Sequence, residues 1–575
     1  MSTASTKSRN RKKKGRTEAA ASKGKPVPPF DPKESLPTDL SEKAWRICSL
    51  LILAVAAFLR LYKLALVPFH HDEGVNGNFL VRLVREGVYQ YDPANYHGPT
   101  LYYFSASAAW VLKFLFGAAA QDKYGLHTVT VRLVPAIFGL ATVGLVLLLR
   151  RRLGSVGALC AAALIAVSPG AVYLSRYFIH ETLFVFFTLG IVVAGLKYYE
   201  ERHPIYLILA SASAALLFAT KETAVISAAV LVIALATTHI YLWLRNRIWP
   251  GERKRRDFNA GRLARIDQLS SLVERFGGSR RLMIWSLVAV IVFVGINVLF
   301  YSSFFRNYPK GVYDAVKTFE FWTKTGKEAH VHPITTYVGW LLRQESPLLV
   351  GGSIGAAIVV LNPRNVFALF SALWAFGLLA AYSLISYKTP WLTLNFIVPL
   401  ALIAGYALQV LYEKALGQLR GVIVIMAIAL AINGYQAIDL NFFNYDNDDK
   451  YYVYVYAHTR RDMLALVDEI DRIAARTNQG NQMGINIASP DYWPLPWDLR
   501  DYKHIGGYQG RVTPTTEPII IASEGQGAEV ETTFGDRYRQ VNSGLNQAGS
   551  YRLRPGVNLL LYVRRDVFER TRLNN

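Results

Sequence analysis

Long apolar runs, separated by short polar or charged segments, dominate the chain from about residue 45 to residue 440. The runs are roughly 16 to 23 residues long, the length of a helix that crosses a bilayer. A soluble domain would place its apolar residues at periodic positions instead. The pattern predicts an all-α polytopic membrane protein with about eleven transmembrane helices. We expect the spans at 45–67, 128–150, 155–174, 181–199, 205–220, 222–244, 283–305, 345–361, 366–386, 391–412 and 420–438.

The character of the chain changes after Leu440. Residues 441–575 are polar, with turns rich in Gly, Asn and Asp. An amphipathic pattern near Thr459 to Arg476 predicts a helix, and Pro518 to Ala522 and Asn558 to Val563 resemble strands. We therefore expect three parts, namely a disordered basic tail at 1–44, a transmembrane domain at 45–440 and a small α/β domain at 441–575.

Positive charge indicates the orientation. Lys and Arg number 63 against 41 acidic residues, a formal net charge of +22. No soluble domain carries a basic face, so nucleic-acid binding is not expected and the excess is topogenic. If Leu101 to Gly117 crossed the membrane, the basic loop Arg245 to Arg281 would lie outside. We therefore expect Leu101 to Gly117 to be juxtamembrane or re-entrant, the N-terminus cytoplasmic and the C-terminal domain extracytoplasmic, in a cell membrane.

The tetrad His70-His71-Asp72-Glu73 follows the first predicted span and leads into an amphipathic stretch, Gly74 to Gly87. Ionisable groups at a membrane boundary are costly to place, which predicts acid–base chemistry at the lipid–water interface. Adjacent residues rarely all point at one ion, so no cofactor or metal site is expected, although a divalent metal is left open. The chain contains no P-loop, no C-x-x-C pair and no H-E-x-x-H motif.

Further ionisable residues fall at the ends of spans that share the outer face with the tetrad. They are His97, Arg132, Arg176, His180, Glu181, Lys221, Glu222 and Lys388. Such residues usually face a cavity or each other. Three structural roles stay open for them as well: a lone Arg or Lys can snorkel to headgroups, Lys221 and Glu222 can compensate each other, and His180 can be an interfacial histidine.

Several cations near a carboxylate suit a phosphate-bearing amphiphile. Arg binds phosphate oxygens bidentately and Lys offers a point charge, so Arg132, Arg176, Lys221 and Lys388 are candidate phosphate ligands. The histidines His70, His71, His97 and His180, with Glu181 and Glu222, are candidate substrate ligands. A tetrad carboxylate could deprotonate an acceptor hydroxyl while the phosphate leaves. The expected donor is a lipid-linked phosphosugar.

An ordered set of motifs resembles the protein O-mannosyltransferase superfamily, which includes glycosyltransferase family 39 and the aminoarabinose transferases and has the membrane-embedded GT-C fold. The resemblance covers about residues 45 to 240. It is carried by the tetrad and by His97-Gly98-Pro99-Thr100-Leu101-Tyr102-Tyr103, Val131-Arg132-Leu133-Val134-Pro135-Ala136, Ser168-Pro169 and Ser175-Arg176-Tyr177. The tetrad, Tyr96-His97-Gly98-Pro99 and Trp493-Pro494-Leu495-Pro496-Trp497 are similar to a bacterial and archaeal subgroup described as flippase-activity-associated.

The resemblance implies a polyprenyl-phosphate sugar donor, inverting transfer to a glycan, lipid or protein acceptor, and surrounding membrane lipids as partners. It implies that Asp72, in preference to Glu73, is the catalytic base and that Arg132 contacts the donor phosphate. The chain departs from the pattern at His97, where aminoarabinose transferases have Lys, and at His180, where relatives commonly have Pro before the acidic residue. A flippase, or a protein that assists one, is the alternative.

The segment around Trp493 and Trp497 is dense in aromatic residues and prolines. Aromatic faces stack on sugar rings, so both tryptophans are candidate substrate ligands. Trp is also favoured at membrane interfaces, and the segment could equally be a rigid loop that packs its domain.

Overall fold

The computed structural model describes residues 40–95, 97–117, 124–248, 278–324, 330–446, 451–541 and 549–573. Most of the predicted basic tail and nearly all of the basic loop between Arg245 and Arg281 lie outside these residues. The first described helix begins at Glu42.

Eight helices among the described residues are long and apolar enough to cross a membrane. These are α2 (Glu42–Leu61), α5 (Thr128–Leu147), α9 (Glu181–Glu201), α11 (Ala224–Ile248), α15 (Ser279–Tyr301), α19 (Val366–Leu384), α20 (Leu394–Lys414, preceded by the 3-10 turn η6, Pro390–Thr393) and α21 (Arg420–Ile438, continued by the π-helical turn η7, Asp439–Phe443).

Three more apolar segments complete the bundle. Two are bent pairs, α7 (Ser155–Val167) with α8 (Pro169–Ser175), and α17 (Thr336–Gln344) with α18 (Ser346–Leu361), and one is the shorter helix α10 (Pro204–Phe218). Every predicted span falls on one of these eleven segments, so the predicted polytopic helical class is confirmed. The chain is a multi-pass membrane protein.

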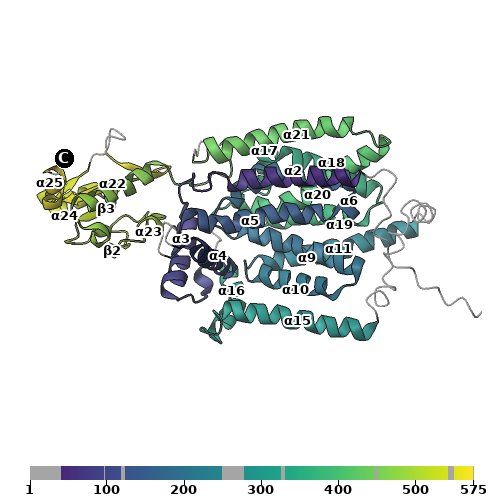
Figure 1. Cartoon of the computed structure of the whole chain (residues 1–575), viewed down its shortest axis with the longest axis horizontal. Helices are drawn as coiled ribbons and strands as arrows, with labels where there is room; N and C mark the ends of the chain where they lie inside the picture. The colour runs from purple at the N-terminus through teal and green to yellow at the C-terminus, as the bar shows by residue number, and fades with distance from the viewer. Residues whose placement is uncertain are drawn as a thin grey trace, which may run out of the picture. The chain divides into compact units, whose positions relative to one another are not determined.

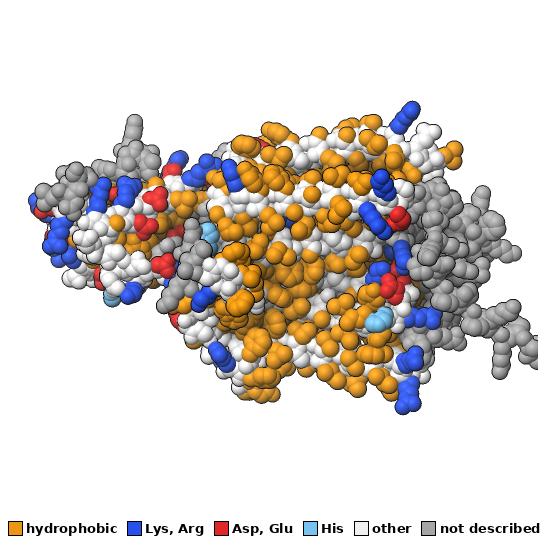
Figure 2. All heavy atoms as spheres, in the orientation of Figure 1, with side chains coloured by type: hydrophobic (Ala, Val, Ile, Leu, Met, Phe, Trp, Pro, Cys, Tyr) orange, Lys and Arg blue, Asp and Glu red, His pale blue; other side chains and the backbone are white. Residues whose placement is uncertain are grey.

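Hydrophobic side chains cover the helices on the face seen in Figure 2, and Lys and Arg lie mainly beyond the ends of this apolar surface. Met283 and Leu287 of α15 are both more than half exposed, as lipid-facing residues are. The helix α4 (Thr100–Phe116) differs, because it buries Leu101 and Tyr102 near its start and exposes Phe114 near its end. Figure 1 shows α3 (His71–Val81) and α4 at one end of the long helices. This is the placement expected of a helix at a membrane boundary.

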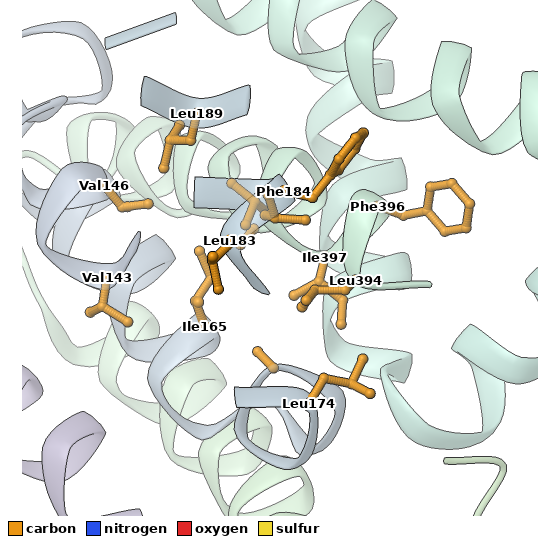
Figure 3. Close-up of a cluster of buried hydrophobic side chains, with 14 of the residues drawn as sticks. Val143, Val146, Ile165, Leu174, Leu183, Phe184, Leu189, Leu394, Phe396 and Ile397 are labelled. Carbon is orange, nitrogen blue, oxygen red and sulfur yellow. The ribbon is translucent and has the colours of Figure 1, made fainter. Parts of the chain in front are cut away.

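The core of the bundle forms where α5, α7, α8, α9 and α20 meet. Figure 3 shows side chains from these helices converging, among them Val146, Ile165 and Phe184 with Leu394 and Ile397. Small residues allow the closest approach, because a Cβ on Gly405 of α20 would lie 2.3 Å from the carbonyl oxygen of Gly157 on α7. Such glycine contacts are typical of helix packing inside membranes.

A proline break between α7 and α8 is stabilised by a buried arginine. Pro169 starts α8 at an angle of 59° to α7, which leaves the last carbonyls of α7 without helical partners. Arg60 of α2 donates to the carbonyl oxygens of Ile165 and Ala166 at 3.1 and 3.0 Å. Arg60 is fully buried, so its charge satisfies backbone groups that no water reaches.

The second break, between α17 and α18, bends the chain by 112° and carries a buried carboxylate, Glu345. Its Oε1 accepts from the Ser168 hydroxyl and the Gly170 N–H, both at 2.8 Å, and from the Tyr454 hydroxyl at 3.3 Å. Glu345 therefore joins the two helix breaks to the chain that follows the last span.

The remaining helices that surround the bundle are α6 (Arg150–Leu153) and α16 (Lys310–Lys324). The π-helical turn η1 (Arg82–Glu86) extends α3, and the 3-10 turn η2 (Pro93–Asn95) precedes α4.

The C-terminal part contains a six-stranded mixed sheet with the main order β2-β1-β3-β6-β4, in which β5 also pairs with β6. Its strands are β1 (Gly484–Ile487), β2 (His504–Gly507), β3 (Ile519–Ser523), β4 (Tyr538–Gln540), β5 (Tyr551–Arg554) and β6 (Val557–Arg564), and its helices are α22 (Asp462–Arg476), α23 (Leu495–Asp498), α24 (Gly527–Phe534) and α25 (Arg565–Leu573).

Successive residues of β3 point to opposite faces of this sheet. Ile519 and Ile521 pack toward α22, while Ile520 and Ala522 pack toward α24. Because both faces of the strand are covered, it is apolar throughout. The predicted α/β character of this part is confirmed.

Candidate active site

The tetrad forms the first turn of α3. His70 is the N-cap, and its Nδ1 accepts from the Asp72 N–H at 3.0 Å while Glu73 Oε2 accepts from the His70 N–H at 3.0 Å. This reciprocal pair is a capping box, which fixes where the helix begins. The helix thus starts at His71, three residues before the amphipathic stretch predicted from Gly74. Burial lowers the pKa of His70 to about 4, and its neutral ring donates from Nε2 to the Tyr456 carbonyl at 3.0 Å.

The two carboxylates of the tetrad have opposite environments. Glu73 is fully buried and holds the Arg132 guanidinium at 2.7 and 2.5 Å. It also accepts from the Phe178 N–H at 2.7 Å. Arg132 uses its remaining donors on the carbonyl oxygens of Leu64, Val67 and Pro68. Glu73 and Arg132 thus bind each other and the surrounding backbone, and the catalytic role of Glu73 and the phosphate-binding role of Arg132 stay predictions.

Asp72 instead leaves 40% of its side-chain surface exposed. The surrounding protein shields the carboxyl from water and so raises its pKa, and the negative charge of Glu181 adds to this effect. Lys221 opposes this rise, as do His71 and His97 when they are protonated. Residues separated by 150 positions therefore act on one carboxylate, and Asp72 is a partly exposed carboxylate within a cluster of ionisable residues.

One ion pair and one histidine–carboxylate contact lie in this cluster. Lys221 Nζ lies 2.6 Å from Glu181 Oε1, and His97 Nδ1 lies 3.0 Å from Glu222 Oε2. Burial alone would lower the pKa of Lys221, but Glu181 and Glu222 outweigh it and raise that pKa. Lys221 therefore pairs with Glu181, not with its neighbour Glu222 as the self-compensating alternative requires.

Close backbone contact positions His97. The Gly98 N–H donates to the Thr220 carbonyl at 3.0 Å, and a Cβ on Gly98 would lie 2.1 Å from the Ala219 oxygen. His180, buried with its pKa held well below the ordinary value by that burial, contacts the Gly98 oxygen through Nε2 at 3.0 Å. Only Gly fits at position 98, and the contact of His180 with its carbonyl oxygen holds this backbone in place. The backbone position in turn places the His97 ring beside Glu222.

The other predicted cations are held by the backbone. Arg176 donates to the Leu59, Tyr62 and Lys63 carbonyl oxygens at 3.0, 2.8 and 2.9 Å, at the C-terminal end of α2. Lys388 donates to the carbonyl oxygens of Ile385 and His332 at 2.5 and 3.2 Å. Cations at such positions satisfy exposed carbonyls and complement the helix dipole, which is a structural role.

The tryptophans of the C-terminal domain pack on α3. Pro494 and Trp493 lie against Gly74, and Trp497 lies against Gly77, where a Cβ would meet the indole at 2.6 Å. Trp497 is buried and stacks on Phe69 at a centroid distance of 4.5 Å. Arg85 reinforces this contact through an ion pair of 2.6 Å with Asp501. Trp497 is thus a packing residue, while Trp493 stays half-buried with its ring 6.2 Å from that of His71.

The structure adds residues that the sequence did not single out. Arg554 Nη1 lies 3.4 Å from His71 Nδ1, and Arg554 also pairs with Asp491. Tyr387, next to Lys388, belongs to the same cluster, since Lys221, Asp72 and Glu181 all act on its hydroxyl. Burial raises its pKa to about 12, Lys221 opposes that rise and Asp72 adds to it. The turn signal Pro555-Gly556 after Arg554 was the one sequence cue for a residue at the tip of a hairpin.

A metal site finds no support in the described residues, which contain no group of three or more His, Cys, Asp or Glu arranged to hold an ion.

A bundle of apolar helices with a cluster of ionisable residues at one end, against which an α/β domain packs, defines a polytopic membrane protein whose polar site lies at the membrane boundary. The family model for dolichyl-phosphate-mannose-protein mannosyltransferases matches residues 108–250. The fold matches ArnT from Cupriavidus metallidurans bound to undecaprenyl phosphate, at a TM-score of 0.59 and 14% identity, over 91% of this chain and 98% of that one. These matches show that the chain shares its fold with ArnT.

Two other solved structures are similar. ArnT in the apo state matches with a TM-score of 0.59 and 13% identity, over 90% of this chain and 98% of that chain. An oligosaccharyltransferase from Archaeoglobus fulgidus matches with a TM-score of 0.49 and 14% identity, over 81% of this chain and 64% of that chain. No curated protein sequence matches the chain.

Proposed function

We propose that this protein transfers a sugar from a polyprenyl-phosphate donor to an acceptor hydroxyl on the outer face of a cell membrane, with Asp72 as the base. One observation carries the proposal. Of the two adjacent carboxylates, Glu73 is buried and paired with Arg132, while Asp72 is half-exposed and its carboxyl has a raised pKa. A raised pKa makes a carboxylate a better proton acceptor.

The proposed step is a single displacement. The acceptor oxygen attacks the anomeric carbon, the bond from that carbon to the phosphate oxygen breaks, and the phosphate leaves with the electron pair. The acceptor proton passes to Asp72. Attack opposite the leaving group inverts the anomeric centre, and cations near Asp72 stabilise the charge that develops on the phosphate.

The membrane setting supports a lipid-linked donor. ArnT, which shares the fold, was solved with undecaprenyl phosphate. The charge pattern of the loops favours a cytoplasmic N-terminus and an extracytoplasmic C-terminal domain. The acceptor is a glycan, a lipid or a protein, since each can present a hydroxyl.

The test compares cells that lack the protein with cells that carry wild-type, Asp72→Asn or Glu86→Gln forms. Mass spectrometry of the lipids should show that a polyprenyl-phosphate sugar accumulates in the deletion and Asp72→Asn strains, because removal of a general base costs about 10²- to 10⁴-fold in rate. Glu86 is exposed on η1 and serves as the matched control. Accumulation of a completed lipid-linked oligosaccharide would instead favour a flippase, and a normal lipid profile in Asp72→Asn would remove Asp72 as the base.

A further inference from the structure

The residues around Asp72 include more carboxylates than permanent cations. Asp72, Glu181 and Glu222 contribute three carboxylates, and Lys221 is already bound to one of them. Three other expected phosphate ligands, Arg132, Arg176 and Lys388, donate to a buried carboxylate or to backbone carbonyls. A phosphate group bound next to Asp72 needs a cation that can change partners.

Arg554 has the position for this role. It ends β5, and the turn at Pro555 and Gly556 reverses the chain into β6, with Gly556 at a φ of +76° that favours glycine. The pairing of β5 with β6 is irregular between Arg552 and Arg554. The tip of this hairpin thereby places the Arg554 guanidinium 3.4 Å from His71, the residue before Asp72.

The contacts of Arg554 are of a kind that can be exchanged. Its ion-pair partner Asp491 keeps 46% of its side-chain surface exposed, whereas Glu73, the partner of Arg132, keeps none. Breaking a pair with an exposed carboxylate costs little, because water solvates the released group. Breaking a buried pair leaves an unsolvated charge and costs several kcal/mol.

His71 can assist without a charge of its own. Burial lowers the pKa of His71, so the ring is neutral and its Nδ1 accepts from Arg554. The other ring nitrogen then carries the proton and can donate to a ligand.

We propose that Arg554, supplied by the C-terminal domain, is the residue that binds the phosphate group of the lipid donor, exchanging Asp491 for the phosphate oxygens. A guanidinium fits two phosphate oxygens at once, which a lysine cannot do. The identity of the ligand as a lipid phosphate rests on the proposed function. In this arrangement one domain supplies the base and the other supplies the phosphate ligand.

The experiment measures the Kd of undecaprenyl phosphate for the full-length protein in nanodiscs. Arg554→Gln should weaken binding by about tenfold or more, because charge-assisted hydrogen bonds to the phosphate are lost. The Kd of Arg554→Lys should fall between those of the wild type and Arg554→Gln. Asp491→Asn should tighten binding, because it frees the guanidinium. Arg552→Gln is the control: Arg552 lies on the same strand, is exposed and pairs with Asp462 at 2.6 Å.

The outcomes separate the two proposals. If the wild-type protein does not bind the lipid, both the proposed polyprenyl-phosphate donor and the proposed role of Arg554 are refuted. If the wild type binds and Arg554→Gln binds equally well, the role of Arg554 is overturned and the proposed function stands. Inorganic phosphate serves as a competitor: competition that disappears in Arg554→Gln supports a headgroup contact, while competition that persists in this variant overturns it.

Discussion

The most direct check on the roles of the two adjacent carboxylates is the substitution Glu73→Gln. Glu73 accepts four hydrogen bonds, two from Arg132 and one each from the backbone N–H groups of His70 and Phe178. The amide keeps one acceptor oxygen but removes the negative charge. Arg132 is then a buried cation without a counter-ion.

The magnitude follows from this burial. Removing one partner of a buried ion pair costs about 3–5 kcal/mol. The full stability of a domain is about 5–15 kcal/mol, so the variant should lose a large share of it. Asp72→Asn, one residue away, removes a half-exposed carboxylate with no comparable partner and should leave stability nearly unchanged.

The assay is the thermal midpoint and the monodisperse fraction of the purified protein in detergent, measured side by side for wild type, Asp72→Asn and Glu73→Gln. A Glu73→Gln protein with wild-type stability and no transferase activity would refute the reasoning, since it would make Glu73 a catalytic group. Arg132→Met in the Glu73→Gln background provides a second check, because removing the orphaned charge should recover part of the lost stability.

Two further predictions concern docking and pH. Gly77→Ala should destabilise the packing of the C-terminal domain on α3 by about 1–3 kcal/mol, because the new Cβ would lie 2.6 Å from the Trp497 ring. Protease cleavage within residues 491–501 should therefore rise. The control is Gly144→Ala, whose Cβ meets open space, and this variant should be neutral or stabilising. The transfer rate should rise with pH as Asp72 loses its proton, with a midpoint above the ordinary Asp value of about 3.9, because the pKa is raised; a pH–rate profile with its midpoint at or below that value would contradict the assignment.

The fold could be predicted from the sequence because a helix that crosses a membrane must be long and apolar, and hydropathy reports both properties. Every predicted span coincides with an apolar helix or bent pair. The bends themselves could not be predicted in the same way, because hydropathy does not report an angle. Pro169 indicates a break after α7 and Pro347 a helix start at α18, but neither proline gives the angle, which is 59° at the first break and 112° at the second.

The sequence indicated which residues of the candidate site lie close together better than it indicated what each residue binds. The charged residues near Asp72 do come together, since Lys221, Glu181 and His97 act on its carboxyl. What a sequence cannot tell is whether an arginine binds a ligand or a carbonyl. Arg132 and Arg176 look alike as span-end cations, and both turn out to serve the protein's own backbone. Arg554 was missed because its neighbour His71 lies 483 positions away.

Glu345 has a consequence for how the chain is assembled. Its carboxylate joins Ser168, made 177 residues earlier, to Tyr454, made 109 residues later. During synthesis, therefore, the helix breaks meet a partner that emerges only after the last span has been inserted. A boundary drawn at residue 441 would separate that partner from the carboxylate. The membrane bundle and the segment that follows it complete each other's packing, so neither is a self-sufficient module.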